Sequence, residues 1–303
     1  KKEDFADTIN EQSWETKSFL KQYERTAADK LANKIIELIN TTDKGGILGF
    51  LHGEKHINRA VKLVTDKIKG GKGIKVFPLY TDLGLDKVQA ALEDIRERRI
   101  VIATNIAETS LTIPDVVYVV DSGLIKQSEW NPTTCRKELN TKFHSKDGCK
   151  QRWGRAGRVQ KGFVHKLYTK EEFVKYFLSH TPPEIKRSNA ESMILGAIAS
   201  GVNDIENFSM LAKPENIELE RALNVVKKRG IVDKDFDLTE EGREIHRLSK
   251  ALSSVLDKVE YNSTQRALDV ATFLILADKY ACLIEAITAI CMMPRMGNAL
   301  YWP

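Results

Sequence analysis

Short apolar runs that alternate with amphipathic helical segments constrain the fold of this chain more than any other sequence feature. Four runs are long enough for a buried strand and too short for a helix: ILGFL (47–51), IKVFPLY (74–80), RIVIA (99–103) and VVYVVD (116–121). Apolar residues at helical spacing predict helices over residues 26–40, 54–69 and 85–95. Because strands separated by helices pair in parallel, this alternation predicts an α/β fold with a parallel sheet covered by helices on both faces.

The sequence after Gly123 departs from this alternation. Residues 124–143 form two partly alternating limbs around Asn131-Pro132, which predicts a β-hairpin projecting from the sheet. FVHKLYT (163–169) predicts one further strand. TPPEIKR (181–187) interrupts the pattern and predicts a domain boundary, so that the α/β domain covers residues 1–180.

Beyond this boundary the sequence pattern is mainly helical. Helices are predicted near residues 189–200 and 215–229, followed by a short hairpin at 231–238 and a helix with Thr239 as its N-cap. This order of elements is typical of a winged helix, which would cover residues 181–247. Apolar spacing then predicts a helical bundle over residues 248–303.

Composition limits the class of protein. A net charge of +5 permits nucleic-acid binding without requiring it. No apolar run approaches the ~20 residues that cross a bilayer, so no membrane partner is predicted. The four cysteines lack zinc-ligand spacing and predict free thiols in a reducing compartment. The six histidines are scattered, and none is predicted to be a metal ligand or a catalytic base.

The octet QRWGRAGR (151–158) carries the most specific chemistry. If it is helical, Gln151, Arg155 and Arg158 share one face, and two guanidiniums with an amide suit a phosphate group. Its two glycines would each cost such a helix roughly 1 kcal/mol relative to alanine. That cost makes sense where another backbone or a ligand comes close. The alternative is a solvated basic helix.

ATNIAETSLTIPDVVYVVDSG (103–123), followed by this octet, resembles the DEAH-box and RNA-helicase-A-like branch of superfamily 2 helicases. GFLHGEKHI (49–57) is similar to that family's FLTGQEEI segment, and PLYTDLGLDKVQAAL (78–92) is similar to its PLYSSLPPEEQQRIF segment. The resemblance implies three domains: a second RecA-like domain (1–180), a winged helix (181–247) and the start of a helical ratchet domain (248–303).

In this family two RecA-like domains hold ATP and RNA between them, and the resemblance implies that this chain supplies the second. The sequence contains no GxxxxGK[ST] phosphate loop and no DEAH-type acidic tetrad for Mg²⁺. ATP, or another NTP, and Mg²⁺ would therefore be held mainly by a first RecA-like domain that this sequence lacks. We expect a fragment of a longer helicase that is inactive alone.

The resemblance also implies roles for the octet. Arg155 and Arg158 would contact the γ-phosphate, and Gln151 would help to order the attacking water. Arginine fingers of this kind neutralise charge that develops in the transition state and are worth ~10³–10⁵ in rate. Trp153 stands where the family has a small residue, and it either packs under the sheet or contacts nucleic acid.

Three further residues are predicted to bind the nucleotide by resemblance. Thr112 matches a threonine near the ribose. Asp115 lies one position beyond the family's usual acidic residue, so it either reaches the ribose or makes a plain turn. Leu92 replaces a phenylalanine that stacks on adenine, which keeps apolar contact and loses the aromatic stack.

The resemblance predicts a nucleic-acid contact at the ends of the strands. Thr104 and Asn105 end a strand, Thr81 takes the place of a family serine, and Gly53 that of a turn glycine. Asp82 replaces the next family serine and would face phosphate with a like charge. The alternative for these polar residues is turn capping.

The hairpin over residues 124–143 is predicted to separate strands. Its basic residues either brace nucleic acid or form an ordinary solvated surface: Lys126, Arg136 and Lys137. Arg96, Arg98 and Arg99 are predicted to form a solvated face before a strand.

The leading hypothesis is the C-terminal half of an ATP-dependent RNA helicase or ribonucleoprotein remodeller. It would step along single-stranded RNA, or RNA duplexes with an overhang, through phosphate contacts that tolerate any sequence. We expect an intracellular monomer, in the cytoplasm or the nucleus, with an activator protein as a further partner. Two alternatives are a non-catalytic RNA- or protein-binding module and half of a DNA helicase.

Overall fold

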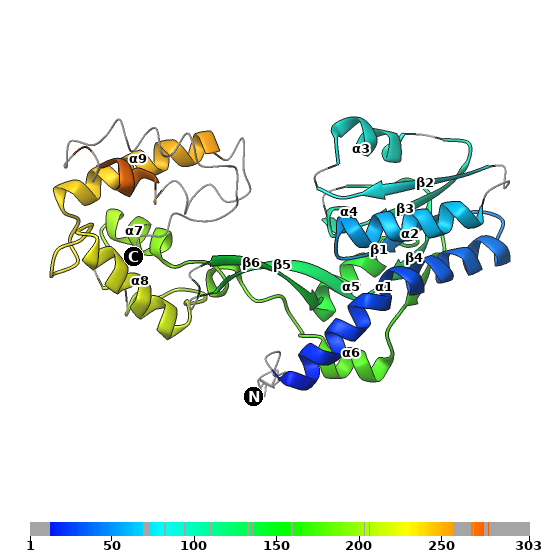
Figure 1. Ribbon diagram of the computed structural model, residues 1–303, viewed down its shortest axis with the longest axis horizontal. Coiled ribbons are helices and arrows are strands. Elements are labelled where there is room, and N and C mark those ends of the chain that lie inside the picture. The colour runs from blue at the N-terminus through cyan, green and yellow to red at the C-terminus, as the bar shows by residue number, and fades with distance from the viewer. Residues whose placement is uncertain are drawn as a thin grey trace. The chain divides into compact units, whose positions relative to one another are not determined.

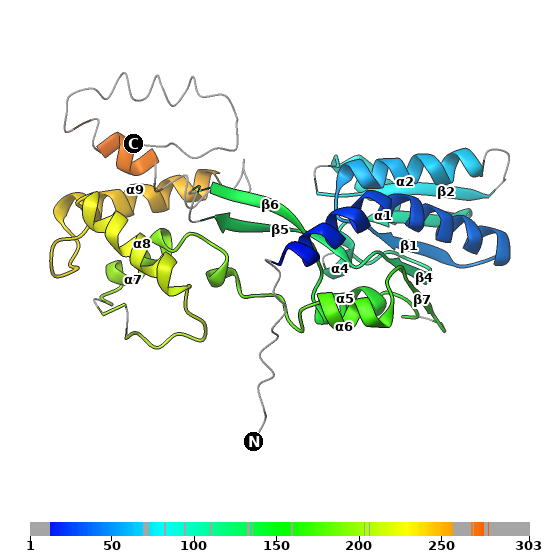
Figure 2. The same ribbon diagram turned by 60° about the horizontal axis from the view of Figure 1, so that its bottom comes forward.

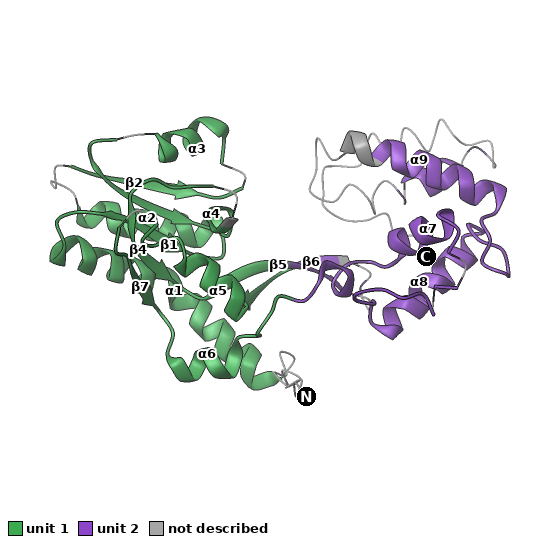
Figure 3. Ribbon diagram, turned by 180° about the vertical axis from the view of Figure 1, so that it is seen from behind, with its two compact units in different colours: residues 1–127, 139–181 green, residues 128–138, 182–303 purple. Residues whose placement is uncertain are grey.

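The computed structural model describes residues 13–68, 73–81, 83–93, 95–109, 111–131, 134, 136–158, 160–202, 204–205, 207–256, 268, 270–275 and 278. The chain divides into two compact units (Figure 3). Unit 1 consists of residues 1–127 and 139–181, and unit 2 of residues 128–138 and 182–303. No helix in the described part of the chain combines the length and apolar character that a membrane span requires.

Unit 1 is built on a five-stranded sheet with strand order β2-β3-β1-β4-β7, and every adjacent pair is parallel. Its strands are β1 (Gly46–Phe50), β2 (Ile74–Leu79), β3 (Arg98–Ala103), β4 (Val116–Asp121) and β7 (Phe163–Lys166). The predicted parallel α/β fold is therefore confirmed. The last strand was predicted over residues 163–169, whereas β7 ends at Lys166 and is therefore shorter than predicted.

Helices cover both faces of this sheet. The helices of unit 1 are α1 (Trp14–Thr41), α2 (Glu54–Lys67), α3 (Leu85–Leu92), α4 (Ile106–Thr109), α5 (Lys146–Trp153) and α6 (Lys170–Tyr176). Figures 1 and 2 show α1 and α2 side by side along the sheet. Alternate residues of β1 point into two separate cores: Ile47 packs with α1 and α2, and Leu48 packs on the opposite face near α4.

The first helix is longer than its apolar periodicity predicts. It begins at Trp14, where the Ser13 hydroxyl accepts a hydrogen bond from the Thr16 amide at 3.1 Å. Tyr23 anchors the added turns, since its hydroxyl donates to the carbonyls of Ser122 and Leu167. The extension therefore depends on contacts with the ends of β4 and β7.

The predicted solvated face at the start of β3 is wrong for two of its three arginines. Arg98 Nε donates to the Gly45 carbonyl at 2.8 Å, and its Nη2 donates to the Thr42 hydroxyl at 2.7 Å. Arg99 is 3% exposed and donates to the Glu93 carbonyl. The reason is that β3 is a central strand that already begins at Arg98, so both side chains lie among covering elements. Arg96 is exposed, as predicted.

The predicted hairpin is present as a separate two-stranded sheet of β5 (Leu124–Asn131) and β6 (Arg136–Phe143). Figure 2 shows the two strands leaving the five-stranded sheet. Asn131 shapes the turn, because its side-chain oxygen accepts from the Thr134 amide and its Nδ2 donates to Glu138.

Apart from hairpin residues 128–138, the described part of unit 2 is mainly helical. It contains a short 3₁₀ helix, η1 (Glu184–Lys186), and the helices α7 (Glu191–Ala199), α8 (Asn216–Lys228) and α9 (Glu240–Leu256). The Thr239 hydroxyl accepts from the Gly242 amide at 2.9 Å, which confirms the predicted N-cap. The predicted hairpin at 231–238 is a single antiparallel bridge between Val232 and Leu238. The winged-helix assignment and the three domain boundaries stay predictions, and most of the bundle predicted beyond residue 256 lies outside the described residues.

Candidate functional site

The octet 151–158 is the end of a helix followed by a turn. Helix α5 ends at Trp153, and the Gly154 amide donates to the Lys150 carbonyl at 2.9 Å. The prediction that Gln151, Arg155 and Arg158 share one helical face is therefore wrong. Gln151 lies exposed on α5, whereas both arginines lie in the turn.

The glycine at 157 ends the helical path. Gly157 has a φ of +75°, in the left-handed region that favours glycine. A Cβ added there would lie 2.8 Å from the Gly162 nitrogen, and a Cβ on Gly162 would lie 2.3 Å from the Gly157 nitrogen. The expected close approach of another backbone is therefore present at Gly157. At Gly154 the nearest atoms would be 3.4 Å away, which is ordinary contact.

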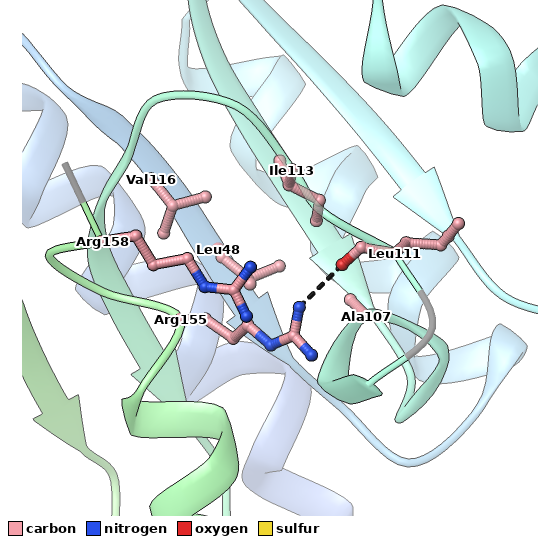
Figure 4. Close-up of a pocket in the computed structure, with 7 residues that line it drawn as sticks. All are labelled: Leu48, Ala107, Leu111, Ile113, Val116, Arg155 and Arg158. Atoms are coloured by element: carbon pink, nitrogen blue, oxygen red, sulfur yellow. Dashed lines mark hydrogen bonds between the residues drawn. The ribbon is translucent and has the colours of Figure 1, made fainter.

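The turn places two arginines beside one pocket (Figure 4). Arg155 Nη1 donates to the Leu111 carbonyl at 2.8 Å, and its Nη2 donates to the Glu108 carbonyl. Arg158 is exposed, and its Nη1 lies 3.4 Å from the Thr112 hydroxyl, a long hydrogen bond. The rest of the lining is apolar: Leu48, Ala107, Leu111, Ile113 and Val116.

The electrostatics of this pocket favour an anion. Burial lowers the pKa of Arg155, and the nearby charge of Arg158 lowers it further. A bound phosphate would relieve the repulsion between the two guanidiniums. The described lining contributes no carboxylate, so these residues fit the phosphates of a nucleotide and do not fit Mg²⁺.

A buried ionic network lies behind the pocket, and sequence reasoning missed it. Arg152 is completely buried, with Nε 3.2 Å from Glu108 Oε2 and Nη1 3.1 Å from Asp121 Oδ1. Nη1 also donates to the Leu124 carbonyl at 3.0 Å. The network therefore joins α4, the end of β4, the start of β5 and α5.

Each acid of this network has further partners. His144 Nε2 lies 2.9 Å from Glu108 Oε2, and Asp121 Oδ2 accepts from Trp153 Nε1 and from the Tyr168 hydroxyl, both at 3.0 Å. Burial alone would raise the pKa of Glu108, but the hydrogen bond with His144 and the charge of Arg152 outweigh it and lower that pKa. Because the Glu108 carbonyl accepts from Arg155, the network also positions the pocket.

One sequence signal could have revealed this network. Asp121 ends a strand of valines and tyrosine, and Glu108 follows the preceding buried strand of the chain, so both carboxylates needed a buried cation. Trp153 is partly buried and packs against the core of unit 1, as the first of its two predicted roles requires, and contact with nucleic acid stays a prediction.

The predicted nucleotide-binding residues do not all meet at the pocket. The Thr112 hydroxyl lies 3.4 Å from Arg158 Nη1, although Thr112 does not itself line the pocket. Asp115 is exposed with a φ of +61°, and its carbonyl accepts from the Gly46 amide at the start of β1. Leu92 is partly buried on α3 and packs against the core that contains Leu48 and Ala107. Neither Asp115 nor Leu92 lines the pocket.

The predicted nucleic-acid residues follow neighbouring strands in the order of the sheet. Thr81 follows β2, Thr104 and Asn105 follow β3, Gly53 follows β1, and Lys126 lies on β5 just after β4. These residues therefore form one row along the carboxyl ends of the strands, which we call the strand-end row. A Cβ on Gly53 would lie 3.2 Å from Lys126 Cε, so these two neighbours nearly touch.

The members of the strand-end row differ in exposure. Thr81, Asn105 and Lys126 are exposed, whereas the Thr104 hydroxyl is buried and has no hydrogen-bond partner among the described residues. Asp82 and the side chain of Arg136 lie outside the described residues. On the hairpin, Lys137 is exposed.

Comparison with known proteins gives concordant matches. The model of the helicase conserved C-terminal domain matches residues 30–160, which include the pocket and the strand-end row. A probable ATP-dependent RNA helicase of Pongo abelii, DHX35, is 32% identical over 214 residues, or 68% of this chain and 30% of that protein.

Two solved structures of HrpB from Escherichia coli are also similar. One is described as a DExH-box NTPase and the other as a DEAH/RHA helicase. They match with TM-scores of 0.74 and 0.71, each at 27% identity and over 89% of this chain. The matched regions are 32% and 33% of those chains, so this chain spans about a third of the length of its relatives.

Proposed function

Because this chain belongs to the DEAH-box branch of superfamily 2 helicases and corresponds to the C-terminal portion of its members, we propose that unit 1 is the second RecA-like domain of an ATP-dependent RNA helicase. The observation that carries this proposal is the pocket beside Arg155 and Arg158, where two guanidiniums face one apolar floor without a carboxylate. Such a surface suits the γ-phosphate of a nucleotide held by another RecA-like domain.

The two arginines would divide the work. Arg155 already uses two donors on the carbonyls of Glu108 and Leu111, so its charge is held in a fixed place. Arg158 is exposed, and one long bond to Thr112 restrains it weakly. We therefore assign Arg158 the direct contact with the γ-phosphate and Arg155 a supporting charge at the pocket wall. Gln151, on the exposed end of α5, would order the attacking water.

ATP and Mg²⁺ would be held mainly by the first RecA-like domain. When bound there, the ion would neutralise charge on the β- and γ-phosphates. Thr112 would lie nearest to the nucleotide among the other predicted residues. Asp115 and Leu92 would contribute only if the nucleotide extends beyond the described pocket.

The strand-end row would hold single-stranded RNA by its backbone. Asn105 and Thr81 offer exposed hydrogen-bonding groups, and Lys126 offers a positive charge beside the Gly53 amide. Contacts with phosphate and sugar position a strand without reading its sequence. We expect a sequence-tolerant monomeric motor that acts on RNA duplexes or ribonucleoproteins and has an activator protein as a further partner.

The test is ATP turnover by a polypeptide that carries both RecA-like domains. Arg158→Ala should reduce RNA-stimulated turnover by about 10³-fold or more while RNA affinity stays within about twofold. Arg155→Ala should also reduce turnover. Arg96→Ala, which removes an exposed arginine that does not line the pocket, is the matched control. Unchanged turnover in both pocket variants would refute the assignment, and equal stimulation by DNA would redirect it to DNA.

A further inference from the structure

Three side chains from separate elements of unit 1 form a compact cluster outside the sites described above. Glu24 lies on α1, His52 lies just after β1, and His56 lies in the first half of α2. His52 Nε2 is 3.0 Å from Glu24 Oε1, and the two imidazole rings have centroids 4.0 Å apart. One ligand-capable atom from each residue lies within 4.8 Å of the other two.

His52 does not have the environment of an ordinary structural histidine. Its side chain is completely buried, and one ring nitrogen faces Glu24. The other, Nδ1, is also buried and has no hydrogen-bond partner among the described residues. Buried histidines usually engage both nitrogens, so an unpartnered one beside a second imidazole needs another explanation.

Both rings are available as electron-pair donors. The neutral imidazole, which is the form that binds metals, offers one nitrogen lone pair to an ion. His52 has a buried nitrogen without a partner among the described residues, and the ring of His56 is partly exposed beside it. The Thr141 hydroxyl donates to Glu24 Oε1 at 3.0 Å and holds the carboxylate in place.

We propose that Glu24, His52 and His56 bind a divalent transition-metal ion of the zinc class. Two imidazoles and one carboxylate form a donor set that suits Zn²⁺, Co²⁺ or Ni²⁺ and does not suit Mg²⁺ or Ca²⁺. Protein ligands of zinc lie about 2.0–2.2 Å from the ion. Atoms already within 4.8 Å of each other therefore need only small side-chain rotations to converge.

The surrounding charges set the expected strength of this site. Lys126 lies near both imidazoles, and Lys55 and Arg59 lie near His56, so three cations oppose a metal ion. A three-ligand site next to these charges should bind more weakly than a closed four-ligand zinc site. The ion would join α1 to the turn between β1 and α2, and it would therefore stabilise unit 1.

The test is metal binding by the 303-residue chain after treatment with a chelator. Zn²⁺ added alone, followed by calorimetry, should bind with one ion per chain and raise the Tm. Co²⁺ added alone should give the visible absorption of a nitrogen- and oxygen-coordinated ion. His52→Thr, which restores the residue of the similar family segment, and His56→Gln should each raise the Kd at least about tenfold.

Two further variants make the result specific. His180→Gln removes a histidine that is 80% exposed and pairs with Asp147, so it should leave the affinity unchanged. Lys126→Gln removes an opposing charge and should tighten binding. The proposal is overturned if Zn²⁺ does not bind the wild-type chain, or if His52→Thr and His56→Gln both bind it as the wild type does. Should His52→Thr misfold by circular dichroism, the partly exposed His56 carries the test alone.

Discussion

Two arginine environments are neighbours within the octet 151–158: the buried network around Arg152 and the pocket beside Arg155 and Arg158. Arg152 is wholly buried and binds two carboxylates, Glu108 and Asp121. Arg155 donates to the carbonyl oxygens of Leu111 and Glu108, and Arg158 is exposed. The same residue type is thus neutralised in one place and left with its positive charge in the other.

The difference explains how one short segment can serve stability and ligand binding together. The charge of a guanidinium that is paired with buried carboxylates is compensated, so it attracts an external anion only weakly. A guanidinium held by carbonyl dipoles is oriented and keeps its full charge. We infer that the network fixes the turn and that the pocket uses the charges which the turn presents.

The largest effect on stability should come from removing the buried cation. Arg152→Met keeps an unbranched apolar stem, removes the guanidinium and leaves Glu108 and Asp121 without their buried counter-charge. The free energy of unfolding should fall by about 3–5 kcal/mol, the usual loss when one partner of a buried pair is deleted. Urea denaturation followed by circular dichroism measures it. Arg158→Ala should change that free energy by less than about 0.5 kcal/mol, and equal losses would erase the contrast.

A smaller effect should follow from neutralising one acid of the network. Glu108→Gln keeps the shape and removes the charge that His144 and Arg152 stabilise, so unfolding should become easier by about 1.5–3 kcal/mol at neutral pH. The folded-state pKa of Glu108 lies below its ordinary value of 4.5, so the unfolded chain binds the proton more readily. This stabilisation is present above about pH 4.5 and disappears as the pH falls through the folded-state pKa.

The pH dependence supplies its own control. Unfolding free energies of the wild type and of Glu108→Gln, measured from about pH 7 down to about pH 3, should converge at the acid end. A gap that stays constant over this range would mean that the charge of Glu108 contributes nothing to the network.

The next effect concerns the backbone that presents the pocket. Gly157→Ala forces a side chain into a φ of +75° with a Cβ 2.8 Å from the Gly162 nitrogen, which should cost about 1–3 kcal/mol of unfolding free energy. Gly154→Ala is a matched control within the octet, because its φ is −63° and the nearest atoms are 3.4 Å away. That variant should be neutral or slightly stabilising in the same urea titration. Equal losses in the two variants would show that the left-handed turn is unimportant.

The sequence predicted the sheet well because local patterns determine it. Apolar runs and the helical segments between them indicated β1 to β4 and their parallel pairing. Parallel pairing then placed the carboxyl ends of these strands along one edge of the sheet. The charge and spacing of the octet predicted a phosphate contact, the resemblance to helicases predicted that the phosphate belongs to a nucleotide, and both stay predictions. The conformation of the octet was predicted wrongly, since the spacing of Arg155 and Arg158 was interpreted as helical periodicity, whereas α5 ends at Trp153 and Gly157 takes a left-handed φ in the turn that follows.

The remaining features depend on residues that are far apart in the chain. The network of Arg152 needs Glu108 and Asp121 from two other elements, and no local pattern brings them together. The cluster of Glu24, His52 and His56 was missed for the same reason. Glu24 lies 28 residues before His52 and precedes the helix that periodicity predicted to begin at residue 26.

The smallest effect should come from an arginine–aspartate pair on the surface of the same unit. Arg59 Nε and Nη2 donate to the two oxygens of Asp29 at 3.1 and 3.0 Å, slightly shorter than the contacts of Arg152 with Glu108 and Asp121 at 3.2 and 3.1 Å. Their side chains are 61% and 37% exposed, so water screens the attraction. A double-mutant cycle with Arg59→Ala and Asp29→Ala should give a coupling of about 0.2–1 kcal/mol that shrinks in high salt. A coupling as large as the loss in Arg152→Met would mean that burial does not distinguish the Arg152 network from this surface pair. A small coupling would assign the difference to desolvation rather than to the geometry of the contact.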